Sequence, residues 1–444
     1  MSNSKSIAHA LAKVFVNGDW TLEDMVQRGG LRLEKHWRWL RPLARRLIDA
    51  FGPHRPSAER VGRFIQLDEG FRRAFQRHEI DLSYQRQPRP VMSPAPGRPS
   101  TWDVPSLVTE GELADWLEIS PGELGFLADV RNLESTRPHG PLRHYRYHWH
   151  PKRSGGSARL IEKPKWRLKS VQRRLLHGIL NQIPPHDAAH GFRKGHSIRM
   201  AVEPHVGQQV VVRMDLRDFF PSIPRRRITG VFRVAGYPER IARLLSALCT
   251  NTVPSDVWKT FPEYAGDQRR HESLYSRLHL PQGSPTSPAL ANLCSYRLDA
   301  RLTGLAKSLS SNYTRYADDL VFSGTVRLAH ATRHLQTQAY LIALEEGFEI
   351  NLRKTRVMRQ SVRQQAMGIV INRKPNIRRA DYDRLKAILT NCIRHGAESQ
   401  NKTGHPEFRA HLAGRIAHVD TLNPSRGDKL RSLFEQIDWD SSSL

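Results

Sequence analysis

The sequence has few cysteines and no long apolar segment. Its three cysteines, Cys249, Cys294 and Cys392, lie far apart and form no Cys-x-x-Cys pair. This spacing argues against a disulfide framework and a structural zinc site, and it favours a reduced, cytoplasmic protein. No apolar run approaches the roughly 18 residues of a membrane-spanning helix, and no signal peptide is evident. We therefore expect a protein that does not enter a membrane.

Acidic residues are also scarce. The 444 residues include 43 Asp and Glu against 70 Lys and Arg, which gives a formal net charge of +27. A soluble protein this basic usually has a polyanion as its partner, and nucleic acid is the first expectation. A basic protein on a membrane surface is the alternative, which the missing apolar segment disfavours. The hydrophobic content of 39% is sufficient for the cores of two or three domains.

One stretch, Tyr313 to Gly324 (YTRYADDLVFSG), places two adjacent carboxylates between strand-forming residues. The pattern predicts a strand, a tight turn and a strand, with Asp318 and Asp319 at the tip. Two like charges this close ionise together easily only when a cation lies between them. Oxygen ligands without a nearby Cys favour a hard cation such as Mg²⁺. A polar hairpin turn is the simpler alternative, because Asp is common in turns.

A third carboxylate favours the metal site over the plain turn. Val210 to Met214 reads VVVRM, an apolar run typical of a buried strand, and it leads directly to Asp215. If this strand lies beside the predicted hairpin, Asp215, Asp318 and Asp319 converge. Three carboxylates could then hold two Mg²⁺ ions about 3.5–4 Å apart, the arrangement that serves phosphoryl transfer.

These acids belong to a series of blocks through which the sequence resembles the reverse transcriptases, and within them the bacterial retron type. The resemblance covers roughly residues 105–440, and the blocks occur in the family's order. They are RLIEKP at 159–164, AHGF at 189–192 with Ser197-Ile198, DLRDFFPSI at 215–223, LPQGSPTSP at 280–288, YADD at 316–319, 347–354, and GIVIN at 368–372.

The resemblance implies an α/β (α+β) fold shaped like a right hand. Fingers, a palm sheet that carries the three acids and a helical thumb would be preceded by a helical N-terminal extension. The expected divisions are a basic helical extension at 1–85, a proline-rich linker at 86–101, fingers and palm at 102–355, and the thumb at 356–444. For the extension, a solvated amphipathic helix and a direct RNA contact remain alternatives.

The activity that the resemblance implies is RNA-directed DNA synthesis, in which a primer hydroxyl attacks the α-phosphate of a dNTP. Two Mg²⁺ ions, or Mn²⁺ as a substitute, would be held by Asp215, the Leu216 backbone, Asp318 and Asp319. The retron type further implies a structured noncoding RNA as template and primer, a branched RNA-linked DNA (msDNA), and antiphage defence beside an effector protein. An intron-type reverse transcriptase and a non-catalytic RNA-binding scaffold are the alternatives. The expected thumb runs to Leu444 with no endonuclease or maturase-like extension, which disfavours the intron type, and the complete set of acids disfavours the scaffold.

Several residues would contact the incoming nucleotide if the resemblance holds. A basic hairpin is predicted where aromatic and polar residues alternate near 145–161, and its cations would bind the triphosphate. A bulky ring after the first acid would exclude a 2′-OH, although that ring could instead belong to the core. Lys354 would protonate the pyrophosphate or attract it by charge. The predicted nucleotide contacts are Lys152, Arg159, Phe220, Gln282 and Tyr316.

The segments tied to RNA recognition in the family are less complete. His205 occupies the His position of the retron NAxxH pattern, but Ala201 replaces its Asn. Gly368 and Asn372 lie in the segment where retron relatives carry Val-Thr-Gly, and here the Thr position is Met367. We expect His205, Gly368 and Asn372 to contact RNA, with the two departures weakening any claim about RNA specificity.

Four further expectations concern secondary structure. They are one amphipathic helix from Leu31 to Phe51, an irregular loop over 251–279, a helix from Pro288 to Leu302, and three C-terminal helices over 380–397, 406–419 and 424–437.

Overall fold

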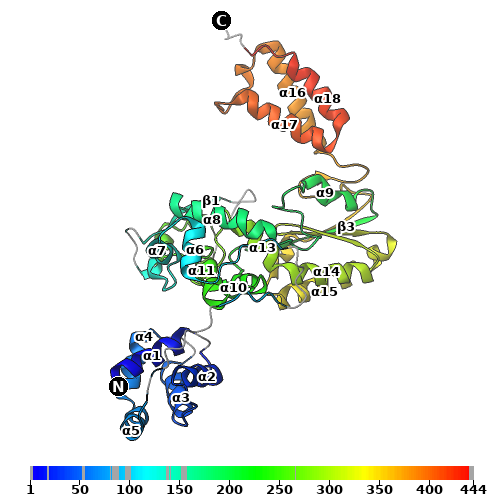
Figure 1. The fold of residues 1–444 in the computed structure, drawn as a ribbon. Helices are drawn as coiled ribbons and strands as arrows, with labels where there is room; N and C mark the ends of the chain where they lie inside the picture. The colour runs from blue at the N-terminus through cyan, green and yellow to red at the C-terminus, as the bar shows by residue number, and fades with distance from the viewer. Residues whose placement is uncertain are drawn as a thin grey trace. The chain divides into compact units, whose positions relative to one another are not determined.

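The computed structural model describes residues 4–17, 20–52, 56–80, 82, 90–95, 102–136, 140, 142–151, 158–265 and 267–439. The chain forms two compact units, Met1–Val91 and Met92–Leu444, and each is described by itself below (Figure 1). Lys152 and most of the predicted linker 86–101 lie outside the described residues. In the part that is described, no helix combines the length and apolar character needed to cross a bilayer.

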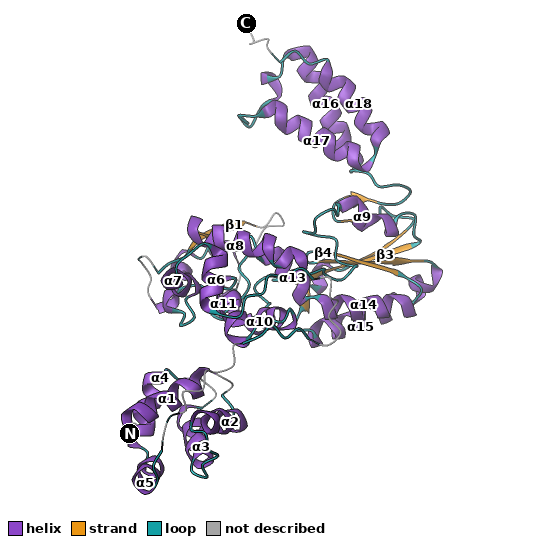
Figure 2. Cartoon of the chain, in the orientation of Figure 1, coloured by secondary structure: helices purple, strands orange, loops and turns teal. Residues whose placement is uncertain are grey.

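Met1–Val91 is helical around its own apolar core (Figure 2). Its helices are α1 (Ser4–Asn17), α2 (Leu22–Arg32), α3 (Leu40–Phe51), α4 (Ala58–Leu67) and α5 (Glu69–Arg77). The single helix predicted from Leu31 to Phe51 is wrong over residues 33–39, because α2 ends at Arg32 and α3 starts only at Leu40. Trp37 and Trp39, in the connection, pack against the buried core.

Met92–Leu444 contains most of the helices and all the strands of the described chain. Its α-helices are α6 (Glu110–Leu117), α7 (Pro121–Ala128), α8 (Trp166–Gly178), α9 (Ile198–Val202), α10 (Arg225–Val234), α11 (Glu239–Leu248), α12 (Gln268–Tyr275), α13 (Ser287–Cys294), α14 (Tyr296–Ser308), α15 (Val326–Glu345), α16 (Arg379–His395), α17 (Phe408–Leu422) and α18 (Pro424–Glu435).

Two helix predictions in this unit need correction, and a third is confirmed. The expected loop 251–279 contains α12, which Asp267 caps by accepting a hydrogen bond from the Arg270 N–H. The helix expected from Pro288 to Leu302 is two helices, because the chain turns at Ser295 between α13 and α14. The three predicted C-terminal helices are present as α16, α17 and α18.

The main sheet is built around β3 (Val210–Arg217). The hairpin β4 (Asn312–Tyr316) and β5 (Asp319–Gly324) pairs with one edge of β3 through β5. On the other edge, β7 (Arg356–Arg359) pairs with the first half of β3 and β6 (Glu349–Ile350) with its end. All four pairings are antiparallel, so β3 is enclosed on both sides. Two short hairpins lie outside this sheet: β1 (Tyr145–Pro151) with β2 (Ala158–Pro164), and β8 (Gln365–Ala366) with β9 (Ile369–Val370).

The two faces of β3 have different chemistry, because successive side chains point to opposite faces. Val210, Val212, Met214 and Leu216 enter the main core together with residues of α13, α14 and α15. The alternate positions carry Val211, then Arg213, then Asp215. On this second face, the apolar packing at Val211 gives way to charged side chains toward the end of the strand.

The C-terminal helices α16, α17 and α18 share a separate apolar core. Where α17 and α18 cross, Gly427 lies directly against Asp420, and a Cβ on Gly427 would stand 2.6 Å from the Asp420 Cα. Arg431 on α18 donates to the Asp420 carboxylate at 2.7 Å. The close crossing therefore requires glycine at position 427.

We expect Gly427→Ala to destabilise this helix pair by about 1–3 kcal/mol, the usual cost of overpacking a tight contact. The measurement is native-state hydrogen exchange of the α17 and α18 amides in the full chain. The matched control is Gly414→Ala on α17, where a Cβ would meet nothing within 4 Å. That change should stabilise the helix by about 0.5–1 kcal/mol, and equal protection in the two variants would contradict the assignment.

Candidate active site

The three predicted acids come together at the end of β3. Asp215 faces Asp319 across the β3–β5 ladder, and Asp318 lies in the turn between β4 and β5. The backbone N–H of Leu216 donates to the carbonyl oxygen of Asp318 at 2.8 Å, which fixes the turn against β3. Asp215 is buried, with 6% of its surface exposed. The convergence expected from the sequence is therefore present.

The turn that carries Asp318 is held at close range by a glycine. Ala317 has a left-handed backbone with φ of +54°, an uncommon conformation for a residue with a side chain. Gly191 approaches so closely that a Cβ there would stand 2.9 Å from the Ala317 nitrogen. The Asn292 side-chain amide donates to the Gly191 carbonyl at 2.8 Å and so holds the approaching loop.

A buried ion pair supports the same turn from behind. Arg315 and Asp299 are both fully buried, and the guanidinium donates to the two carboxylate oxygens at 2.8 and 2.7 Å. Arg315 also donates to the Ala317 carbonyl at 3.1 Å and to the Asn292 side chain at 3.0 Å. The Tyr313 hydroxyl donates to Asp299 at 2.9 Å. Arg315 thus joins the turn to helices α13 and α14, and through Asn292 to the loop that carries Gly191.

Two further cations lie directly on the acids. The Lys354 ammonium is 2.9 and 3.0 Å from the two carboxylate oxygens of Asp215. The Arg213 guanidinium binds Asp319, with its Nη2 2.8 and 3.1 Å from the two oxygens. Arg213 precedes Asp215 by two residues, so both project from the same face of β3.

Burial and like charge make ionisation of the central acid costly. Burial raises the pKa of Asp318 to about 6, and the charges of Asp215 and Asp319 add to the rise. Burial also raises the pKa of Asp319, while Arg213 acts in the opposite direction. A divalent cation would relieve this cost, and three carboxylates are the oxygen donors that Mg²⁺ prefers.

The described side chains nevertheless do not form a preassembled three-ligand metal cluster. Cations instead contact these acids: Lys354 lies against both oxygens of Asp215, and Arg213 pairs with Asp319. The donor chemistry fits a hard divalent cation, provided that Lys354 leaves Asp215 when the cation binds.

Aromatic rings gather beside the acids. Phe220 is half-buried, and its ring centroid lies 6.3 Å from that of Phe192 and 5.5 Å from that of Phe219. Phe192 also lies 6.3 Å from Tyr316. Phe219 is buried in the main core while Phe220 only borders it, so the two adjacent rings have separate environments. Phe192, 51% exposed, was not predicted as a site residue, although it lies in the quoted AHGF block.

The β1–β2 hairpin connects to the same region through a buried polar network. The Glu162 backbone N–H donates to the Gln282 carbonyl at 2.8 Å. Glu162 is itself buried, and its carboxylate meets His279 at 2.9 Å and the Asn251 amide at 2.8 Å. Gln282 is thereby placed against the hairpin. Arg159, exposed on β2, lies near enough to Asp318 that its charge opposes the burial-driven rise of that pKa.

The predicted RNA-binding residues have less accessible positions. His205 is fully buried under the β4–β5 hairpin, with its ring nitrogens 2.7 Å from the Ser323 hydroxyl and 2.8 Å from the Thr314 hydroxyl. This differs from the expected RNA contact, because the imidazole has no free surface. The Asn372 side chain ties down its own loop, accepting from the Gln364 N–H at 2.9 Å and donating to the Val362 carbonyl at 2.9 Å.

Gly368 is the one member of this group that is exposed. It follows Met367 in the two-residue turn between β8 and β9, and both have positive φ, +52° and +85°. Two positive φ values define the hairpin turn that favours glycine. Gly368 therefore serves the turn geometry whether or not RNA contacts it.

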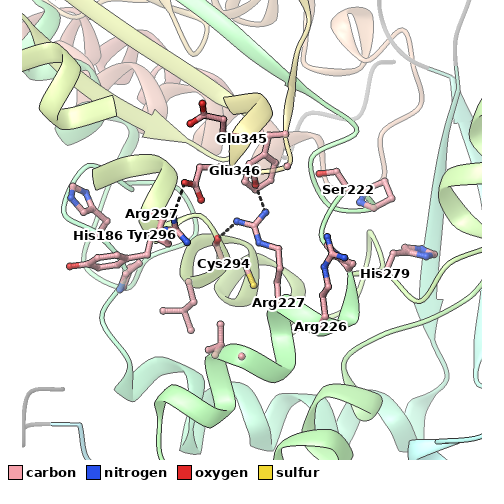
Figure 3. Close-up of a pocket in the computed structure, with 18 of the residues that line it drawn as sticks. His186, Ser222, Arg226, Arg227, His279, Cys294, Tyr296, Arg297, Glu345 and Glu346 are labelled. Carbon is pink, nitrogen blue, oxygen red and sulfur yellow. Dashed lines mark hydrogen bonds and ion pairs between the residues drawn. The ribbon is translucent and has the colours of Figure 1, made fainter. Parts of the chain in front are cut away.

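Residues of α10, α13 and α14 contribute to the lining of a cavity of 1640 Å³. Figure 3 shows part of this lining. Arg217 and Asp218, the second and third residues after Asp215, contribute to its wall, but none of the three acids does. Arg227 extends from α10 into this region and donates to the carbonyl oxygens of Cys294 at 2.7 Å and Glu346 at 2.6 Å. The cavity is thus separate from the carboxylate cluster.

Comparison with known proteins defines the class. Residues 150–371 match the family described as reverse transcriptase (RNA-dependent DNA polymerase), and this segment contains all three aspartates, the Gly191 loop and Lys354. Among solved structures, the foamy viral protease-reverse transcriptase in complex with double-stranded DNA has a TM-score of 0.32 and 15% identity, over 68% of this chain and 45% of that chain. The match to the family identifies an RNA-directed DNA polymerase.

Comparison with individual relatives shows which type of reverse transcriptase this chain resembles. The retron Mx65 reverse transcriptase of Myxococcus xanthus is 39% identical over 74% of this chain and 72% of that protein. The retron Mx162 reverse transcriptase of the same organism is 34% identical over 74% and 67%. The retron Ec86 reverse transcriptase of Escherichia coli is 32% identical over 52% and 64%. The chain belongs to the retron reverse transcriptases.

We expect Asp299→Asn to destabilise the protein by about 3–5 kcal/mol, because it leaves the Arg315 charge buried without its carboxylate. Thermal unfolding measures this loss, with Glu349→Gln as the control. Glu349 pairs with Arg217 at 2.7 Å but is half-exposed, so its loss should cost below about 1 kcal/mol.

A double variant separates stability from activity. Arg315→Met/Asp299→Leu replaces the pair with apolar side chains and should recover most of the stability. DNA synthesis should remain low, because the Ala317 carbonyl has lost its donor. Full synthesis by the double variant would show that Arg315 does not position the turn.

Proposed function

We propose that this chain copies a structured noncoding RNA into single-stranded DNA that stays joined to the RNA through a branch, the product called msDNA. The observation that carries the proposal is the meeting of Asp215, Asp318 and Asp319 at one end of β3 in a retron reverse transcriptase. A 2′-OH within the RNA would prime the synthesis. The substrates are dNTPs, and pyrophosphate leaves.

The proposed metal site uses oxygen donors only. Asp215, Asp318, Asp319 and the Leu216 backbone carbonyl would hold two Mg²⁺ ions, for which Mn²⁺ could substitute. When bound, these ions would stabilise the negative charge that develops on the attacking and leaving oxygens. Lys354 must release Asp215 for that carboxylate to become a ligand. The pKa of Asp318, about 6 without a cation, predicts that metal binding competes with protonation of this acid.

The remaining roles fall to side chains around the acids. Lys354, once released from Asp215, would donate a proton to the pyrophosphate or attract it by charge, a role that its position beside Asp215 supports. Arg159 and Lys152 would bind the triphosphate, with Arg159 supported by its electrostatic effect on Asp318. Gln282 and Tyr316 would contact the nucleotide. Phe220 would lie under its sugar and exclude a 2′-OH by size.

The fold elements take the parts of a right hand in this proposal. The β1–β2 hairpin is a movable finger over the triphosphate. The five-stranded sheet is the palm: β3, β4, β5 and β6 lie within the expected residues 102–355, and β7 lies just beyond that bound. Helices α16, α17 and α18 form the thumb within residues 356–444, gripping the duplex product by its phosphates. Exposed cations on α16, such as Arg384 and Lys386, would serve this purpose without reading sequence.

The biological setting follows from the retron family. We propose that the chain works in the cytoplasm, where its three buried cysteines remain free thiols. Its RNA–DNA product and an effector protein would act together against phage. In RNA binding, Gly368 is the exposed candidate, whereas His205 and Asn372 would act by supporting the local structure.

The test compares nucleic acid copurifying from cells that express the wild type or Asp318→Asn/Asp319→Asn with the flanking DNA. We expect a small DNA that separates from RNA only after debranching, and its loss in the variant. RNA without DNA from both proteins would instead indicate a scaffold. Unbranched DNA that is lost in the variant would keep the polymerase and reject msDNA synthesis.

Phe220→Val tests the choice of sugar. Removing the ring should raise incorporation of ribonucleotides relative to deoxynucleotides by roughly 10- to 200-fold, the range of one steric contact worth about 1–3 kcal/mol. Single-nucleotide primer extension measures the ratio. Phe192→Leu is the matched control, because it removes a neighbouring ring without changing Phe220. An unchanged ratio in Phe220→Val, with normal dNTP use, would reject Phe220 as the gate.

A further inference from the structure

Trp166 is exposed in a way that no other tryptophan of this chain is. All nine tryptophans lie within the described residues, and eight of them are buried or half-buried. Trp166, the first residue of α8, has 76% of its surface exposed and belongs to none of the apolar clusters. Trp116, packed beside the same helix near Arg174 and Gly178, shows the ordinary arrangement. A single exposed apolar side chain is ordinary on a protein surface, so the case for a partner rests on what surrounds Trp166.

The orientation of the Trp166 ring is supported by contacts within the protein. The Arg167 guanidinium lies over the Trp166 ring, 5.6 Å from its centroid. Arg167 is itself fixed by Glu123 of α7, whose carboxylate accepts from its Nη2 at 2.8 Å. One face of the indole is therefore supported through Glu123 and Arg167, and the large exposed area leaves the ring available on another side.

The outward side of α8 continues from Trp166 as a stripe of cations. With 3.6 residues per turn, Lys169 and Arg173 lie on the same side of the helix as Trp166. Leu168, Val171 and Leu175 lie on the opposite side, in the core. Trp166 and Arg173 are about 10 Å apart along the axis, which spans about three steps of a stacked strand at 3.4 Å each.

The charges of this stripe are not neutralised within the protein. Arg167 and Arg174, on the flank of α8, pair with Glu123 and Glu118. Among the described residues, neither Lys169 nor Arg173 has an ion-pair partner, and α8 itself contains no acid. Lys169, in the first turn of α8, also opposes the helix dipole, so its charge does not stabilise the helix.

The stripe begins close to the polymerase site. Trp166 is the fourth residue after Glu162, whose backbone N–H donates to Gln282, so the two Cα atoms lie at most about 14 Å apart. A line of cations ending in an exposed aromatic ring is the surface that binds single-stranded nucleic acid, through phosphates and base stacking.

We propose that Trp166 stacks on a base of the single-stranded RNA template next to the active site, while Lys169 and Arg173 bind its phosphates. This rests on the proposed function, which supplies the RNA template. It adds a binding site for the unpaired template, separate from the duplex contacts assigned to the C-terminal helices. A stacking ring would keep the next template base oriented before it pairs.

The experiment measures binding without dNTPs, so that it does not depend on synthesis. The probe is an RNA–DNA hybrid with a short single-stranded 5′ extension of the RNA, and the reference probe is the same hybrid with blunt ends. Fluorescence anisotropy gives Kd for the full-length wild type, Trp166→Ala, Trp166→Phe and, as a control for loss of an exposed apolar side chain, Leu341→Ala. A 2-aminopurine in the extension reports stacking directly.

We expect Trp166→Ala to weaken binding of the extended hybrid by about 5- to 150-fold, the range for loss of one base–aromatic stack. It should leave the blunt hybrid unchanged and remove the 2-aminopurine quenching. Trp166→Phe should retain most of both effects, and Leu341→Ala should behave as the wild type. Arg173→Gln should lower the salt dependence of binding by about one phosphate contact.

Two outcomes would overturn the proposal. Equal binding of the extended hybrid by wild type and Trp166→Ala would show that no base stacks there and would leave the ring to another partner. Equal weakening for extended and blunt hybrids would place Trp166 on the duplex. The binding assay uses neither dNTPs nor DNA synthesis, so a failure of msDNA synthesis is distinguishable from a failure of stacking.

Discussion

Three carboxylates of like charge meet at the end of β3, and much of the surrounding structure serves to keep them there. Burial makes their ionisation harder, as the raised pKa of Asp318 shows. The chain offsets this repulsion with cations at three depths. Arg315 is fully buried, Arg213 is half-exposed on the same strand face, and Lys354 is 44% exposed. The most accessible of the three cations is Lys354, the one that the proposed metal ion would replace.

The difference in burial separates a structural cation, Arg315, from a cation that is free to move, Lys354. Arg315 makes four hydrogen bonds, to Asp299, Asn292 and Ala317, and cannot leave without exposing a buried acid. Lys354 has one carboxylate partner and a long flexible stem, so its release costs little. The turn can therefore stay rigid while the charge around Asp215 changes, as the proposed exchange of Lys354 for a metal ion requires.

The sequence predicted the parts of this site that depend on local pattern. Asp215 ends an apolar strand, Asp318 and Asp319 occupy a turn between strands, and the pairing of those strands follows from their patterns. It did not predict the partners that only the tertiary fold brings together. Asp299 lies on a helix that the pattern joined to α13, and Glu162 and His279 are 117 residues apart. Nothing in the local sequence distinguishes these buried ion pairs from surface charges.

The prediction for His205 differs from the structure for the same reason. A His in a family motif associated with RNA indicated a surface contact, yet two hydroxyls from different strands enclose its ring. Burial lowers the pKa of His205 to about 3, so the imidazole stays neutral. Its two ring nitrogens connect β4 and β5 through hydrogen bonds with Thr314 and Ser323.

The cations of α8 differ in the same way, because some have a partner within the protein and others do not. Arg167 and Arg174 are occupied by carboxylates, while Lys169 and Arg173 remain for nucleic acid. The net charge of +27 predicts a nucleic-acid partner but not where it binds. The binding surface is indicated by the cations that have no carboxylate partner within the protein. Those that remain, next to the one exposed tryptophan, mark where an unpaired strand could meet the protein.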